Sequence, residues 1–207
     1  MNFLHILFSQ YQNTPTYQVV LELLAGTFGI ISVISAKEEK FWVFPLGIVS
    51  TCIYTYILMI HHIWGNMFTN IYYTIVSLYG WYAWLKKDQQ HHLLTHIHYA
   101  TVHESFISVV IFLLVIALMS LIYLFEKTGH HLLWASIDIF CTASWLTAMY
   151  LMVKKAIENW ILWIIADLIA LSLYIHNHLY VTTFQYLVFM IISGFAYPKW
   201  KKVIEQH

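Results

Sequence analysis

The sequence predicts an all-α integral membrane protein with seven transmembrane helices, arranged as two parallel three-helix repeats joined by a linker helix (3+1+3). Three observations lead to this fold class: a composition poor in charge, seven apolar stretches of membrane-spanning length, and a weak likeness between the two halves of the chain. We treat residues 1–207 as a single membrane domain, with 17–85 as the first repeat, 105–125 as the linker helix and 132–198 as the second repeat.

The composition excludes the usual soluble classes. Of the 207 residues, 60% are hydrophobic and 10% are charged, whereas soluble domains carry about 25% charged residues. The formal net charge is zero and every basic residue other than histidine is a lysine, so the chain offers no basic patch for nucleic acid. Membrane lipid is therefore the expected surrounding, and nucleic acid is not an expected partner.

Seven stretches are apolar enough to cross the hydrocarbon layer, which takes about 20 helical residues. They are residues 17–36, 41–60, 64–85, 105–125, 132–153, 159–176 and 179–198. The joining segments are short, except for the polar, histidine-rich segment 86–104. This segment is the expected boundary between the two halves.

The lysines predict the orientation. If the N-terminus lies outside, nine of the ten lysines fall on the cytoplasmic side and Lys127 alone lies outside. Basic residues are retained on the cytoplasmic side of membrane proteins. We therefore expect the N-terminus outside and the C-terminus in the cytoplasm, which an odd number of spans satisfies.

The two halves resemble each other weakly. The sequence around Trp42 aligns with the sequence around Trp160 at an offset of 118 residues. Further on, Trp84 in GWYAWLKK aligns with Trp200 in GFAYPKWKK after a deletion of two residues. Both copies start outside and end inside, so the repeat is parallel and the span between them serves as the inversion linker. Transporters are often built from such duplicated units, with substrate held near the midplane.

The sixth span carries a candidate binding stripe. Trp160, Trp163 and Asp167 share one face of a helix because their spacing is i, i+3 and i+7, and Tyr174 continues it. A carboxylate inside a span costs roughly 2.5–3.5 kcal/mol, so its presence indicates function. Aromatic faces beside a carboxylate suit a flat organic cation, with a cation–π attraction of ~2 kcal/mol when desolvated.

The alternative interpretations of this stripe are structural. Trp160 could belong to the aromatic belt at the membrane interface. Asp167 could join helices through a hydrogen bond.

Further polar candidates lie in the third and seventh spans. Asn70 and Tyr73 follow a polar stripe in the third span, and Gln185 lies at a corresponding depth in the seventh. Amides offer both donors and acceptors, which suits a carboxamide or a ribose, although they could equally hold helices together. Trp42, as the predicted counterpart of Trp160, completes the predicted substrate-binding set.

Other chemistries find little support. Cys52 and Cys141 fall inside apolar stretches and read as small core residues. The histidines are mostly adjacent pairs, which point apart on a helix and lack the spacing of metal ligands. We expect no metal, no cofactor and no catalytic residues, so the protein is predicted not to be an enzyme.

Several motifs together resemble the PnuC family of bacterial vitamin-precursor transporters. These motifs are FWVFPLG at the start of the second span, SLYGWYAWLKK closing the third, and NWILWIIAD opening the sixth with its WxxW. The resemblance covers roughly residues 20–200. It implies a 3+1+3 fold distantly related to the SWEET sugar carriers, a homotrimer in the bacterial inner membrane, and facilitated diffusion of nicotinamide riboside. Thiamine, also a flat aromatic cation, is the alternative substrate within the family.

The resemblance also implies roles for single residues. It maps the WxxW pair onto Trp160 and Trp163 as substrate-stacking residues, and polar contacts onto Asn70, Asp167 and Gln185. The sequence has no sign of a second, coupled ion site, so we expect a uniporter whose product is trapped by a cytoplasmic vitamin kinase. A seven-helix receptor or signalling protein is the alternative from another class.

Overall fold

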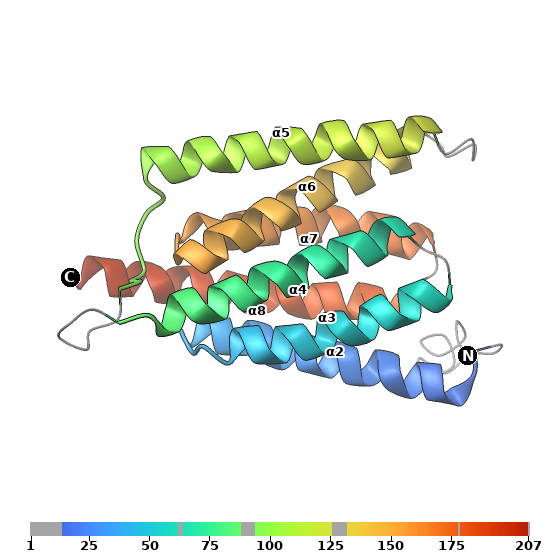
Figure 1. The fold of residues 1–207 in the computed structure, drawn as a ribbon, viewed down its shortest axis with the longest axis horizontal. Helices are drawn as coiled ribbons and strands as arrows, with labels where there is room; N and C mark the ends of the chain where they lie inside the picture. The colour runs from blue at the N-terminus through green and yellow to red at the C-terminus, as the bar shows by residue number, and fades with distance from the viewer. Residues whose placement is uncertain (1–13, 62–63, 88–93, 126–131, 178, 207) are drawn as a thin grey trace.

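The computed structural model describes residues 14–61, 64–87, 94–125, 132–177 and 179–206 as seven α-helices and the segments that join them (Figure 1). The helices are α2 (Thr16–Lys37), α3 (Val43–Ile60), α4 (Trp64–Leu85), α5 (Val102–Phe125), α6 (Leu132–Lys154), α7 (Glu158–His176) and α8 (Tyr180–Glu205). Each predicted span thus coincides with a helix to within a few residues, apart from the C-terminal end of α8. Lys127 and several of the histidine pairs lie outside the described residues.

Six of the seven helices are long and apolar enough to cross a membrane, and α4 is the exception. The length of α4, 22 residues, suffices for a span. Its hydropathy is lowered by polar residues, among them Asn70 and Ser77, that face the interior of the bundle. This pattern is expected of a helix that lines a polar cavity rather than lipid.

The last helix extends well beyond the predicted end at residue 198. It continues through Pro198 to Glu205, where Lys199 forms an ion pair with Glu38 and Lys201 with Glu205. The apolar pattern of the sequence ends near residue 198, but the backbone hydrogen bonds of a helix do not depend on that pattern.

The helices pack in two groups of three, with α5 on the outside. In the first group α3 packs against α2 and α4, and in the second α7 packs against α6 and α8. The groups meet where α2 contacts α8 and where α4 contacts α6. Figure 1 shows α5 along the edge of the bundle, beside α6, which is its main contact. The end of the bundle that carries Lys37, Lys86, Lys154 and Lys199 is called the lysine end below.

The two groups turn alike at the lysine end. Glu39, after α2, and Lys155, after α6, are the non-glycine residues with positive φ among those described, at 58° and 57°. At each turn two successive amides donate back to the preceding helix, at 2.9 Å after α2 and 3.0 Å after α6. This pattern is the Schellman C-cap. The two turns therefore have one geometry and lie 116 residues apart in the chain.

The same offset relates pairs of aromatic rings. Phe44 and Trp84 meet edge to face, with centroids 5.0 Å apart, and Trp160 and Trp200 do so at 5.3 Å. The structural counterpart of Trp160 is therefore Phe44, and the predicted alignment of Trp42 on Trp160 is two residues out of register. With the corrected offset, Trp84 matches Trp200 without a deletion.

A third matched contact lies deeper in the bundle. The Ser50 hydroxyl donates to the Ala25 carbonyl at 2.8 Å, and the Cys141 thiol donates to the Ala166 carbonyl at 3.5 Å. The same two positions are thus joined in each group, with the side-chain donor on α3 in one and on α6 in the other. Sequence alignment missed this register because few of the matched residues are chemically alike.

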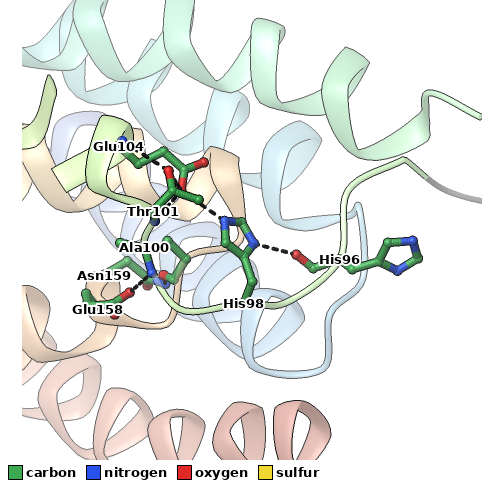
Figure 2. Close-up of polar contacts among 8 residues, drawn as sticks. His96, His98, Ala100, Thr101, Glu104, Glu158 and Asn159 are labelled. Carbon is green, nitrogen blue, oxygen red and sulfur yellow. Dashed lines mark hydrogen bonds and ion pairs between the residues drawn. The ribbon is translucent and has the colours of Figure 1, made fainter. Parts of the chain in front are cut away.

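The connection between the groups runs across the lysine end. Residues 94–101, called the strap, place His98 beside the turn that precedes α7 (Figure 2). The His98 amide donates to the Lys155 carbonyl at 3.2 Å, and the Ile157 amide donates to the His98 carbonyl at 2.9 Å. The Ala100 amide donates to the Glu158 carboxylate at 2.9 Å. The strap therefore fixes the start of α7.

Candidate functional site

A cavity of about 180 Å³ lies between six helices, and α5 contributes no lining residue to it. Towards the lysine end its wall includes Ala36, Val43 and Trp160, and further in it includes Asn70 and Gln185. The cavity thus occupies the middle of the bundle, where the two groups of helices face each other.

One wall of the cavity is aromatic. Trp163 is partly exposed, and its ring stacks on Tyr73 of α4 with centroids 6.5 Å apart and planes 30° apart. Trp160 also borders the cavity, but its side chain is fully buried and packs edge to face on Trp200. Trp163 therefore lines the cavity beside Tyr73, whereas Trp160 lines it from the ring pair that it forms with Trp200.

Asp167 lines the same wall and is fully buried. Its Oδ1 accepts a hydrogen bond of 2.8 Å from Nε1 of Trp145 on α6. Its Oδ2 has no hydrogen-bond partner among the described residues. A buried carboxylate with a free oxygen is costly in the absence of a compensating group. The geometry is therefore that of a site prepared for a cation or a hydrogen-bond donor.

Helix α3 supplies another part of the wall, where the side chains are small or carry hydroxyl groups. Gly47 and Ser50 line it from α3 together with Thr51, whose hydroxyl lies 2.7 Å from that of Thr74. The Tyr54 hydroxyl donates to Oε1 of Gln185 at 2.9 Å, which joins α3 to α8 across the cavity. This wall can exchange hydrogen bonds with hydroxyl and amide groups of a ligand.

Six of the eight predicted site residues border this one cavity: Trp160, Trp163, Asp167, Asn70, Tyr73 and Gln185. Tyr174 does not border it and instead packs its ring on Tyr186, with centroids 4.8 Å apart. Trp42 is 52% exposed and stacks on Phe41 outside the cavity. Trp42 was predicted to bind substrate because it was aligned with Trp160. In the corrected register the counterpart of Trp160 is Phe44, which agrees with the position of Trp42 outside the cavity.

Several lining residues escaped prediction. They include Ser50, Thr51, Tyr54, Tyr186 and Phe189. Hydroxyl residues within a span are common and carry little signal when taken singly. The corrected offset of 116 residues would have indicated some of them, because it relates each to a predicted site residue. It pairs Asn70 with Tyr186, Tyr73 with Phe189, and Thr51 with Asp167.

The described residues that line the cavity give it a negative electrostatic character. No lysine, arginine or histidine borders it among the described residues, and Asp167 is its acidic group there. The described residues also contain no cluster of His, Cys, Asp and Glu suited to a metal ion. Electrostatically, the cavity favours a ligand with positive charge and disfavours one with phosphate.

Comparisons with known proteins agree with each other. The family described as "Nicotinamide mononucleotide transporter" matches residues 19–202. The chain is similar to the nicotinamide riboside transporters PnuC of Escherichia coli (strain K12) and of Shigella flexneri. Each is 18% identical over 194 residues, which covers 84% of this chain and 81% of the relative. The fold is similar to that in the crystal structure of the vitamin B3 transporter PnuC, with a TM-score of 0.70 and 20% identity over 99% of this chain and 89% of that one.

Proposed function

This chain belongs to the nicotinamide mononucleotide transporter family, and from that premise we propose that it carries nicotinamide riboside across a bacterial inner membrane by facilitated diffusion. It is a multi-pass membrane protein of the PnuC family, and it is a transporter and not an enzyme, since its relatives are transporters. The observation that carries the choice of substrate is Asp167, a fully buried carboxylate with one free oxygen in the cavity wall.

The ring of nicotinamide riboside suits the aromatic wall, to which α7 contributes Trp163 and Asp167 and α4 contributes Tyr73. It is a flat pyridinium that carries a permanent positive charge. Asp167 supplies the compensating negative charge, and Trp163 with Tyr73 supplies ring faces. Cation–π attraction of this kind is worth about 2 kcal/mol when the groups are desolvated. A cation in the cavity also removes the cost of the isolated carboxylate.

The sugar and the carboxamide suit the polar lining residues, which come from both groups of helices. Ribose hydroxyls and the amide can both donate and accept, as can Asn70, Gln185 and the hydroxyl of Thr51. A cavity of about 180 Å³ is close to the roughly 150 Å³ that admits a benzene ring. The ring alone fills that volume, so the site must widen to take the sugar as well.

The nucleotide is a poor substrate on the same grounds. A phosphate carries up to two negative charges, and the described lining residues provide no cation to pair with it, while Asp167 repels it. Although the family name refers to the mononucleotide, this cavity therefore favours the riboside.

The architecture is proposed as two parallel three-helix repeats joined by α5, with the domain limits predicted from the sequence. The contacts between groups support it, because the first helix of each meets the third helix of the other: α2 meets α8 and α6 meets α4. A twofold relation between parallel units produces this exchange.

We place the lysine end in the cytoplasm, following the positive-inside rule. The homotrimer, the SWEET relation and the partnership with a vitamin kinase remain predictions from the family resemblance.

Binding to the purified protein tests the proposal. We expect saturable binding of nicotinamide riboside, with nicotinamide mononucleotide at least about tenfold weaker, a difference of about 1.4 kcal/mol. Asp167→Asn should weaken the charged riboside more than its uncharged dihydro form, because only the former loses an ionic partner. Asp138→Asn is a matched control, since Asp138 lies on α6 outside the cavity wall.

Three outcomes would contradict the assignment. Tighter binding of thiamine than of the riboside would indicate that thiamine is the substrate. Equal losses for the charged and uncharged ribosides in Asp167→Asn, together with a lower melting temperature, would make Asp167 a structural link between α6 and α7. No binding of either vitamin would remove the proposal.

A further inference from the structure

A layer of four aromatic rings lies at the lysine end of the bundle, and Trp160 of this layer borders the cavity. Phe44, Trp84, Trp160 and Trp200 come one each from α3, α4, α7 and α8, and each is at most 3% exposed. The centroids of Trp84 and Trp200 are 6.4 Å apart, so the edge-to-face pair of each group touches that of the other. The two groups of helices therefore meet in this ring layer, next to the cavity.

An ion pair lies on this layer. Nζ of Lys155 donates to Oε1 of Glu39 at 2.6 Å, and the Lys155 side chain is 2% exposed. The same Nζ lies 4.7 Å from the centroid of the Trp84 ring. Trp84 is itself held to the second group, because its Nε1 donates to the Val153 carbonyl at 3.0 Å. The ion pair therefore joins the two groups of helices directly above the ring layer.

The backbone conformation of Glu39 and Lys155 indicates that their side chains have a role beyond packing. Glu39 and Lys155 both have left-handed φ values, and glycine is the usual residue at this position of a Schellman C-cap. Non-glycine residues in this region cost energy and are kept where the surroundings need their side chains. Both turns keep a charged residue, and the two charges pair with each other across the interface.

We propose that Glu39 and Lys155 form a gate with the ring layer, which shuts the substrate cavity at the lysine end. The inference rests on the proposed function, because a gate has meaning only if a solute passes through the cavity. Opening requires the two turns to separate, which breaks the Glu39–Lys155 pair and parts Trp84 from Trp200. The Lys155 charge then enters water, so the pair sets the population of the closed form.

Cysteine labelling tests the gate without any vitamin. Ser193 lines the cavity on α8 and is 1% exposed, so in Ser193→Cys a membrane-impermeant thiol reagent reports access to the cavity. Inverted and right-side-out membrane vesicles present the two faces separately, and the parent chain with its own Cys52 and Cys141 gives the background. In the Ser193→Cys chain, Glu39→Gln should speed labelling from the lysine-end face about tenfold, because the buried Lys155 ammonium loses its charged partner.

The neighbouring acid is a matched control. Glu38 is as exposed as Glu39 but pairs with Lys199 instead of Lys155, so Glu38→Gln in the Ser193→Cys chain should label at the rate of Ser193→Cys alone. In the same Ser193→Cys chain, the exchange Glu39→Lys/Lys155→Glu restores opposite charges at both turns and should return the rate to within about twofold of Ser193→Cys alone. Rescue by the exchange also shows that the single variant had not merely misfolded.

Equal labelling rates in the Ser193→Cys chain with Glu39→Gln, with Glu38→Gln and with neither change would overturn the gate. So would faster labelling of Glu39→Gln from the opposite face alone. Since the assay contains no vitamin, a changed labelling rate with no riboside binding would leave the gate standing while removing the proposed substrate.

Discussion

At the scale of single residues, the two tryptophans of the WxxW motif have different surroundings. Trp163 is partly exposed and lies on the cavity with a ring face beside Tyr73. Trp160 is fully buried in the ring layer. A motif in the sequence shows that two indoles share a helix face, but not how much of each ring the neighbouring helices cover.

Trp163→Ala should weaken riboside binding by about 1–2 kcal/mol through the loss of one stacked face, with little change in melting temperature. Trp160→Ala should instead destabilise the fold by about 3–5 kcal/mol, as expected of a buried indole. Isothermal titration and thermal unfolding of the two variants separate these effects.

Trp160→Phe provides the matched control, because Phe44 makes the equivalent edge-to-face contact in the first group. It should fold and bind nearly as the parent does. Unchanged riboside affinity in Trp163→Ala would show that the substrate does not stack on this ring.

Asp167 illustrates what sequence can and cannot predict about a site. Its position within a span, and its face shared with Trp163, follow from helical spacing alone. Its bond to Trp145 does not, because Trp145 lies on another helix and has no motif around it. Contacts between helices depend on the packing of the whole bundle, which no local pattern encodes.

At the scale of elements, apolar length predicts the helices well and their ends less well. The start of α3 at Val43 and the end of α8 at Glu205 differ from prediction because C-caps, turns and ion pairs at the membrane surface decide them. Segment 94–101 was expected only to be a polar link, whereas its backbone hydrogen bonds attach it to the turn before α7.

The strap should respond to pH through His98. Nδ1 of its ring faces the His96 carbonyl at 2.9 Å and Nε2 faces the Glu104 carboxylate at 3.0 Å (Figure 2). Two acceptors favour the doubly protonated ring. Burial lowers the pKa of His98, but the bonds to His96 and Glu104, with the charges of Glu104 and Glu158, outweigh it and raise the pKa overall.

A raised pKa means that the folded state binds the proton more tightly than the unfolded chain does. The stabilisation is therefore complete below the ordinary imidazole pKa of about 6.5, and it is lost as the pH rises through the raised value. The melting temperature of the parent should exceed that of His98→Gln in mildly acidic buffer, and the gap should narrow in alkaline buffer. The exposed His103 on α5 gives a control, His103→Gln, for the other histidines. A gap that does not change with pH would contradict this account of the strap.

At the scale of the whole molecule, the matched contacts relate two groups of helices that differ in their chemistry. Gly47 and Thr51 in the first group occupy the positions of Trp163 and Asp167 in the second, and all four line the cavity. Gly47 leaves space in the first group at the position where Trp163 provides an aromatic ring in the second. Likewise, Thr51 provides a hydroxyl group where Asp167 provides a carboxylate. The weak likeness of the halves predicted a duplication, but the register emerged only from turns and ring pairs that geometry preserves.

Transport itself tests the account most directly. Nicotinamide riboside should enter proteoliposomes that contain the parent protein until the concentrations inside and outside are equal, whatever the pH or sodium gradient. The described residues that line the cavity carry Asp167 as their acidic group, which the account assigns to the substrate rather than to a coupled proton. Proteoliposomes that contain the Asp167→Asn variant should take up the riboside far more slowly than those that contain the parent. Accumulation above the outside concentration, abolished by a protonophore, would contradict the account, and so would uptake no faster than in protein-free vesicles.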